Sequence, residues 1–316
     1  MRIFFFAANL GLGIGIFLLG LKLLTNALET VLGFRLHSVL TRLTATKVKG
    51  LLAGLLLTAF IQSSSAVGAA LVVLTDTGVL SLTQALGVML GANVGTTVTA
   101  QLIALPLERT ALPLCAVGLA VRYLGQRKSA GTALFGLGAV FFGLSFSTWA
   151  LAPLLKAPAM RSVITTLTDT PLEAVSFGMV LTILAQSSSA VTGLVIGLVK
   201  QNLLPASVAV AMALGSNVGT VATTLLASVG RSRAGRATAY ADFLFNLGGV
   251  VLILPVFPLF FQVVQSLSAD PSRQVAHAHT LFNGVTALLA LPFLQHLAGL
   301  AWRGAGIGGA NKNKLG

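Results

Sequence analysis

Charged residues are scarce in this 316-residue chain, at 9% of the total. A soluble globular protein carries about 25% charged residues, so the scarcity excludes a soluble enzyme and a soluble nucleic-acid-binding domain. Acidic residues are the rarer charges, with 7 Asp and Glu against 20 Lys and Arg. Cysteine is limited to Cys115, which excludes an internal disulfide.

The sequence also lacks the signatures of a catalytic site. It has no phosphate-binding glycine loop followed by Lys, no Ser–His–Asp arrangement and no pair of carboxylates inside one apolar run. The 4 histidines show no metal-ligand spacing. We therefore expect no enzymatic activity, no cofactor and no use of ATP.

Long apolar runs dominate the chain instead. Hydrophobic residues make up 55% of it, and the mean hydropathy is +0.93. Several runs reach 18 residues, the length with which a helix begins to span a bilayer, and they are continuous rather than alternating as in an outer-membrane barrel. The predicted class is an all-α integral membrane protein, with a bacterial inner membrane as the expected location.

The net charge of +13 comes from basic residues in short connections between apolar runs. In a soluble protein it would suggest a nucleic-acid partner, but here the positive-inside rule explains it, and no nucleic acid is expected. The rule places four basic segments in the cytoplasm: 33–49, 122–130, 230–237 and 303–316.

Two polar motifs recur at one offset. IQSSSAVG begins at residue 61 and AQSSSAVT at 185; LGANVGT begins at 90 and LGSNVGT at 214, so both pairs lie 124 residues apart. A shared offset indicates an internal duplication. We expect a first membrane repeat at 1–121, a cytoplasmic loop at 122–130, a second repeat at 131–240, two C-terminal transmembrane helices at 241–302 and a basic cytoplasmic tail at 303–316.

Parity of the crossings predicts how the repeats are oriented. Three apolar runs, 50–74, 81–105 and 110–121, separate two basic segments. If both segments are cytoplasmic, one run must enter and leave on the same side, and 50–74 fits because QSSSA divides it into two arms of half-membrane length. Its counterpart 174–198 then enters from the other side. We expect inverted repeats with about seven full crossings plus two re-entrant or broken-helix hairpins, as in secondary transporters with alternating access.

The QSSS runs carry the first candidate site. Successive serines on a continuous helix would partly face lipid, whereas a broken helix turns hydroxyls, free backbone N–H groups and helix N-termini toward one centre, which suits an anion. The alternative is that the serines only pack helices together. The predicted anion-binding residues are Ser63, Ser64, Ser65, Ser187, Ser188 and Ser189.

The motifs GANVGTT at 91–97 and GSNVGTV at 215–221 suggest a cation site. Glycine permits an unwound backbone, and carbonyl, amide and hydroxyl oxygens suit a hard cation such as Na⁺. The alternative is close helix packing through glycine. Equal spacing of 31 residues from Gln62 to Asn93 and from Gln186 to Asn217 favours one composite site. The predicted Na⁺ ligands are Gln62, Asn93, Thr96, Thr97, Gln186, Asn217 and Thr220.

Asp242 is the one acidic residue expected inside a span, near its cytoplasmic end. An intramembrane carboxylate suggests cation coupling, and the alternative is an interfacial ion pair with Arg233 or Arg236. DFLFN at 242–246 also matches HTLFN at 279–283 at an offset of 37, which predicts two related helices with hydrogen-bonded asparagines.

The two QSSS segments, each followed by GANVGT or GSNVGT, resemble the type II sodium–phosphate cotransporter family and its bacterial members. The resemblance extends from FLLGLKLL near the N-terminus to HTLFN at 279–283. It implies Na⁺-coupled transport of inorganic phosphate, with the QSSS segments at the substrate and ion sites. The chain departs from the pattern at Val221, where a second Thr is expected, at DFLFN in place of HxxFN, and in the expected absence of a C-terminal regulatory domain.

The expected function is a secondary active transporter of phosphate, with Na⁺ as the coupling ion. A dianion loses much solvation energy on leaving water, and a co-bound Na⁺ offsets that loss. Phosphate export and transport of another oxyanion are alternatives, and a channel or a non-transporting membrane scaffold is a different class. The expected partners are inorganic phosphate, Na⁺ and the lipid bilayer, with a homodimer left open.

Overall fold

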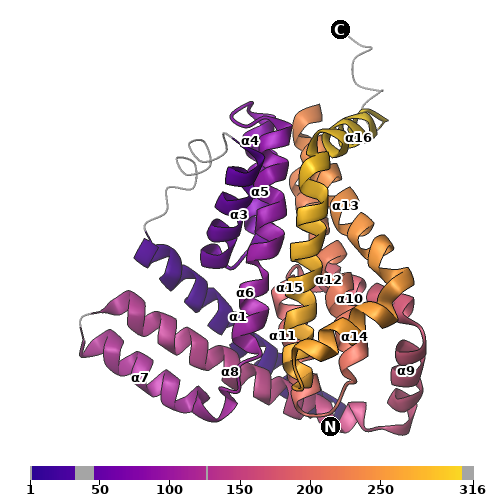
Figure 1. Ribbon diagram of the computed structural model, residues 1–316. Coiled ribbons are helices and arrows are strands. Elements are labelled where there is room, and N and C mark those ends of the chain that lie inside the picture. The colour runs from indigo at the N-terminus through magenta and orange to yellow at the C-terminus, as the bar shows by residue number, and fades with distance from the viewer. Residues whose placement is uncertain (1, 33–45, 126, 308–316) are drawn as a thin grey trace.

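The computed structural model describes residues 2–32, 46–125 and 127–307, and every regular element in these ranges is helical. This confirms the predicted all-α class (Figure 1). Six segments of the described chain are long and apolar enough to cross a membrane: Phe6–Leu28, Leu82–Ile103, Lys128–Leu155, Ala206–Ala227, Arg233–Leu267 and Pro271–Gly306. Residues 33–45 and 308–316, which belong to two of the basic segments predicted to be cytoplasmic, lie outside the described part of the chain.

The internal duplication extends from the motifs to the helix bounds. The first half contains α1 (Arg2–Leu32), α3 (Lys47–Ile61), α4 (Ser64–Asp76), α5 (Leu82–Gly95) and α6 (Thr97–Ile103). The second half contains α8 (Lys128–Leu155), α9 (Pro158–Asp169), α10 (Pro171–Ala185), α11 (Ser188–Lys200) and α12 (Ala206–Ala227). Adding 124 to the bounds of α3, of α4 and of the α5–α6 pair gives those of α10, α11 and α12.

The segment predicted to cross the membrane at 110–121 forms a shorter element. After the 3₁₀ turn η1 (Glu108–Thr110), α7 (Ala111–Tyr123) has 13 residues. At 1.5 Å per residue it spans about 20 Å, less than the hydrocarbon core of about 30 Å. It packs along α8 and is not among the six candidate spans of the described residues. The described residues thus hold six candidate spans, or up to seven if the bent pair Pro158–Asp169 and Pro171–Ala185 forms one span, against the expected number of about seven.

The C-terminal part repeats a smaller unit. α13 (Arg233–Ile253), η2 (Leu254–Val256) and α14 (Phe257–Leu267) are followed by α15 (Pro271–Ala290), η3 (Leu291–Phe293) and α16 (Leu294–Ile307). Both helices break at a Leu-Pro pair, Pro255 and Pro292, because proline has no N–H to donate to the preceding turn. The matching breaks at an offset of 37 support the prediction of two related helices.

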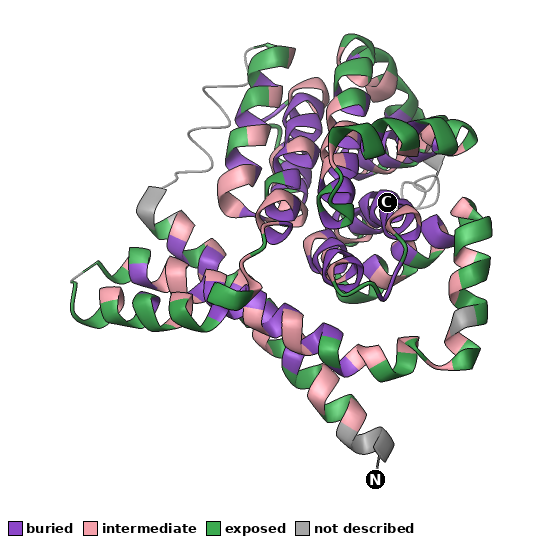
Figure 2. Ribbon diagram, turned by 60° about the horizontal axis from the view of Figure 1, so that its bottom comes forward, coloured by how far each residue is buried: buried purple, intermediate pink, exposed green. Residues whose placement is uncertain are grey.

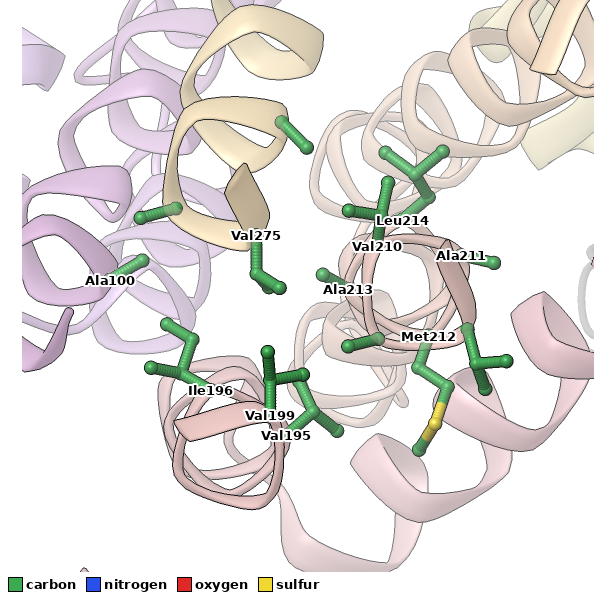
Figure 3. Close-up of a cluster of buried hydrophobic side chains, with 14 of the residues drawn as sticks. Ala100, Val195, Ile196, Val199, Val210, Ala211, Met212, Ala213, Leu214 and Val275 are labelled. Atoms are coloured by element: carbon green, nitrogen blue, oxygen red, sulfur yellow. The ribbon is translucent and has the colours of Figure 1, made fainter. Parts of the chain in front are cut away.

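Buried residues gather in the interior of the bundle, while the outer helices are mostly exposed (Figure 2). α12 is the most enclosed candidate span, with 83% of its apolar window buried. Apolar side chains of α6, α11, α12 and α15 meet there, among them Ala100, Ile196, Ala213 and Val275 (Figure 3).

Glycines allow the crossing helices to pack closely. A methyl group at Gly91 would overlap the Leu51 carbonyl oxygen of α3, and one at Gly215 would overlap the Val175 carbonyl oxygen of α10. The backbone here stays helical: α12 is continuous through its motif, and Thr96 between α5 and α6 keeps helical angles. The expectation of an unwound backbone is therefore wrong, and close packing explains these glycines.

Candidate functional site

Both QSSS segments break a helix in the same way. Gln62 and Gln186 end α3 and α10 in the left-handed conformation, with φ of 58° and 55°. Non-glycine residues seldom adopt this conformation, which turns the chain out of the helix. Each glutamine side-chain oxygen accepts a hydrogen bond from a threonine of the following crossing helix, Thr99 or Thr223. These two threonines are also 124 residues apart, but they lie outside the two motifs, so only an alignment of the whole repeats identifies them.

The first serine after each glutamine caps a helix. The Ser63 Oγ accepts a hydrogen bond from the Ala66 amide, and the Ser187 Oγ accepts one from the Ala190 amide, both at 3.2 Å. These hydroxyls satisfy backbone N–H groups at the start of α4 and α11. Ser63 and Ser187 thus have a structural role. The remaining predicted serines follow in the first turns of the two helices: Ser64, Ser65, Ser188 and Ser189.

A small cavity brings four predicted site residues together, Ser64, Asn93, Thr220 and Asp242. It combines both repeats with the C-terminal helix α13 and has room for about one water-sized particle. We name the residues that line this cavity the first cluster. They are Ser64 and Gly68 of α4, Met89, Ala92 and Asn93 of α5, Thr220 and Thr224 of α12, and Asp242 and Asn246 of α13.

Asp242 is the only charged residue of the first cluster and is 6% exposed. The Thr224 hydroxyl donates a hydrogen bond to Asp242 Oδ2 at 2.9 Å, and Asn246 Nδ2 donates one to Oδ1 at 2.9 Å. The Asn93 side chain also lies within hydrogen-bonding reach of the carboxylate. Arg233 does not pair with Asp242; its guanidinium donates to the Trp302 carbonyl oxygen at 2.9 and 3.1 Å. Ion pairs of the described residues involve other acids, so the interfacial-pair alternative is wrong.

Asn217 belongs to a different buried group. His279 Nε2 lies 3.1 Å from Asn217 Oδ1, and Asn283 Nδ2 donates to the same oxygen at 3.3 Å. Nearby on α12, the hydroxyl of Ser216 lies 3.3 Å from that of Thr192. All five of these side chains are at most 3% exposed.

The remaining predicted ligands do not line the first-cluster cavity. Gln62 and Gln186 bind threonines, and the Thr97 hydroxyl donates to the Val94 carbonyl oxygen at 2.8 Å. Thr96 is buried, and its hydroxyl has no hydrogen-bond partner among the described residues. Ser188, the counterpart of Ser64, is buried outside this cavity. Gly68 and Thr224 also line the cavity, but they lie outside the two motifs, so the motifs alone do not predict them.

Comparison with known proteins gives a consistent result. The sequence profile described as Na⁺/Pi-cotransporter matches residues 16–148 and 151–294. YqeW of Bacillus subtilis strain 168, which its name leaves uncharacterized, is 34% identical over 278 residues, covering 87% of this chain and 91% of YqeW. No solved structure matches.

A second group of relatives is longer. YjbB of Escherichia coli K12, which its name provisionally assigns to inorganic phosphate export, is 28% identical over 283 residues. YjbB of Salmonella typhimurium LT2 is 28% identical over 284 residues. Each match covers 88% of this chain and 52% of the relative, so the chain spans about half the length of YjbB.

The profile covers both QSSS breaks and overlaps each of the six apolar segments. The chain is thus a multi-pass membrane protein, and its bacterial relatives agree with an inner-membrane location. It belongs to the Na⁺/Pi-cotransporter family, a family of membrane transporters for phosphate.

Proposed function

We propose that the chain is a secondary active transporter that couples Na⁺ to the movement of inorganic phosphate by alternating access. The observation that carries this proposal is the way in which the two broken-helix hairpins, α3–α4 and α10–α11, are anchored at their far ends.

The end of α4 is held at the end of α12. Arg231 Nη1 lies 3.3 Å from Asp76 Oδ2, and the Ser232 amide donates to Asp76 Oδ1 at 2.7 Å. Asp76 is the last residue of α4, and Arg231 and Ser232 follow α12. α5 begins shortly after Asp76, so the start of α5, the end of α4 and the end of α12 lie on one side of the bundle.

The end of α11 is held at the end of α6. The Lys200 ammonium pairs with Glu108 and donates to the carbonyl oxygens of Ile103 and Leu105 at 2.8 and 2.7 Å. Lys200 is the last residue of α11, and Ile103 is the last of α6. Because α5–α6 is a candidate span, this side lies across the bundle from the end of α4 (Figure 1).

Two hairpins that open toward opposite faces support inverted repeats and re-entrance at the QSSS breaks. In this arrangement the N-termini of α4 and α11 approach the interior from the two sides. We assign phosphate to the free N–H groups and hydroxyls at these N-termini, with Ser64, Ser65, Ser188 and Ser189 as donors. Na⁺ would bind beside it through the predicted amide and hydroxyl oxygens.

Access to the site requires the helices to move. The first-cluster cavity is small, and Asn217 is enclosed by His279 and Asn283. A phosphate ion therefore needs α4 or α11 to shift from the helices that it contacts. Motion of one hairpin at a time would open the site to one face at a time, which is the requirement of alternating access.

The test is uptake of ³²P-phosphate into proteoliposomes with Na⁺ or choline outside. We expect saturable uptake that requires Na⁺, and exchange of labelled for unlabelled phosphate across the membrane. Equal uptake in both media rejects Na⁺ coupling. Flux that neither saturates nor shows counterflow indicates a channel, and competition by unlabelled sulfate or arsenate identifies another oxyanion.

Phosphate export is the second candidate, because the YjbB relatives carry that function in their name. A carrier runs in the direction of the net gradient, so direction is a property of the conditions as well as of the protein. Vesicles of defined orientation, loaded with phosphate and exposed to a Na⁺ gradient of either sign, distinguish export from import.

A further inference from the structure

The first cluster has a counterpart at equivalent positions of the duplication, which we name the second cluster. An offset of 124 residues relates α4 to α11 and the α5–α6 pair to α12. An offset of 37 residues relates α13 to α15. The equivalent pairs are Ser64 and Ser188, Gly68 and Thr192, Met89 and Ala213, Ala92 and Ser216, Asn93 and Asn217, Thr220 and Thr96, Thr224 and Ala100, Asp242 and His279, and Asn246 and Asn283.

The first difference between the clusters is space. Gly68 and Ala92 leave the cavity open, whereas their counterparts Thr192 and Ser216 are fully buried, and their hydroxyls lie 3.3 Å apart. A methyl group built at Gly68 would lie 4.0 Å from Asp242 Oδ2. The same methyl group would lie 2.4 Å from Thr224 Cγ2, so glycine at position 68 allows Thr224 to pack beside the carboxylate.

The second difference is charge. Asp242 is buried with neutral hydrogen-bond donors only, and none of the nine lining residues is basic. α5 and α12 contain no charged residue at all. Burial of an unpaired carboxylate is costly, and hydroxyl and amide donors reduce this cost without neutralising the charge. The first cluster thus lacks one positive charge.

In the second cluster a histidine occupies the equivalent position. His279 Nε2 and Asn283 Nδ2 both contact Asn217 Oδ1, so that oxygen already has its donors. In the first cluster the buried Asn246 Oδ1 has no hydrogen-bond partner. Asn283 Oδ1 in the second cluster has no hydrogen-bond partner either. The two clusters therefore differ in the carboxylate and in the open space, and not in the asparagine oxygens.

We propose that the first cluster is a binding site for one Na⁺ ion and that the second cluster is its inactive counterpart. Asp242 supplies the balancing charge, and Ser64, Asn93, Thr220 and Asn246 supply neutral oxygens. One carboxylate balances a monovalent ion, oxygen ligands suit a hard cation, and the cavity admits a particle of about the size of one water. This inference rests on the proposed function, for which it specifies one coupling site outside the QSSS runs.

The first test is binding of ²²Na⁺ to the purified protein without phosphate. Asp242→Asn keeps the shape and one acceptor oxygen but removes the charge, and we expect the apparent Na⁺ affinity to fall at least tenfold. Asp169→Asn is the matched control, since Asp169 is exposed at the end of α9, and its affinity should stay within twofold of wild type. Wild-type protein that binds no Na⁺, or folded Asp242→Asn with wild-type affinity, overturns the proposal.

A second variant leaves Asp242 in place. Gly68→Thr combined with Thr224→Ala installs the residues of the second cluster at positions 68 and 224, and Thr224→Ala removes the methyl group that a side chain at Gly68 would otherwise meet. We expect Na⁺ binding to be lost because the cavity is filled. Unchanged Na⁺ affinity of the double variant contradicts the proposed location of the ion.

The outcomes also separate this inference from the proposed function. Na⁺ binding that depends on Asp242 in a protein that moves no phosphate supports the site and rejects the transport proposal. Na⁺-driven phosphate uptake whose Na⁺ dependence is unchanged in folded Asp242→Asn supports transport and rejects the site.

Discussion

Asp76 and Lys200 occupy equivalent positions, 124 residues apart, at the ends of α4 and α11, yet they carry opposite charges. Asp76 pairs with Arg231 beyond α12, and Lys200 pairs with Glu108 beyond α6. Each hairpin is therefore tied to the crossing helices of the other repeat. The duplication has kept the position of the contact and exchanged the signs of its charges.

The two contacts should contribute unequally to stability. The Lys200 side chain is 14% exposed and also binds two carbonyl oxygens, whereas that of Arg231 is 42% exposed. Exposed ion pairs contribute about 0–1 kcal/mol, and hydrogen bonds to charged groups contribute about 1.5–3 kcal/mol. We expect Lys200→Met to lower the Tm in detergent clearly more than Arg231→Met does. A larger effect of Arg231→Met would contradict the stronger, more buried contact assigned to Lys200.

The sequence predicts the duplication well because constant spacing is visible without any knowledge of packing. It also predicts where the hairpins break, since a polar QSSS run cannot continue a lipid-facing helix cheaply. The helix bounds that recur at an offset of 124 follow from the same repeat. It predicts a functional role for Asp242 for a similar reason, because a carboxylate in an apolar run needs partners.

Packing decided the features that the sequence could not predict. The glycines of GANVGT and GSNVGT permit an unwound backbone, but the backbone there is helical, and α3 and α10 lie so close to Gly91 and Gly215 that a side chain would overlap them. The role of Gly68 on α4 depends on how close it lies to Asp242 on α13, which the sequence does not show. Residues 110–121 are apolar enough for a span, but the helix that forms there is too short.

The glycine packing can be tested with a matched pair. Gly215→Ala places a methyl group on the Val175 carbonyl oxygen, whereas Gly248→Ala on α13 meets nothing within 4 Å. Alanine is better than glycine in a helix by about 0.5–1 kcal/mol. We therefore expect thermal unfolding to show a lower Tm for Gly215→Ala and an unchanged or higher Tm for Gly248→Ala. Equal effects in the two variants would mean that the close approach of α10 and α12 is not required.

The contribution of Asp270, at the start of α15, to the stability of the fold should depend on pH. Partial burial would raise the pKa of Asp270, but hydrogen bonds from the Ser272 side chain and amide outweigh it, so the pKa lies below its usual value. A carboxyl group with a lowered pKa stabilises the folded state above its unfolded pKa, and this contribution disappears as pH falls through the folded pKa. We expect Asp270→Asn to have a lower Tm than wild type at pH 7, with the difference shrinking below about pH 4. A difference that grows in acid would contradict the sign.

The serines that follow the caps should affect transport more than stability. Ser64 lines the cavity and Ser188 is its buried counterpart, and neither caps its helix. A lost hydrogen bond to a charged ligand costs about 1.5–3 kcal/mol, which corresponds to roughly tenfold or more in kcat/KM. We expect Ser64→Ala and Ser188→Ala each to reduce ³²P-phosphate uptake by about that factor with the Tm nearly unchanged.

The matched control is Ser266→Ala on α14, where the exposed hydroxyl only bonds its own helix, and uptake should stay within about twofold of wild type. If the two serines serve only to pack helices, Ser64→Ala and Ser188→Ala will lower the Tm and the amount of folded protein, and uptake per folded molecule will remain normal. Normal uptake per molecule in both variants would exclude these serines from the phosphate site. A loss in one variant alone would indicate that a single hairpin binds the anion, so that the other hairpin moves without contacting it.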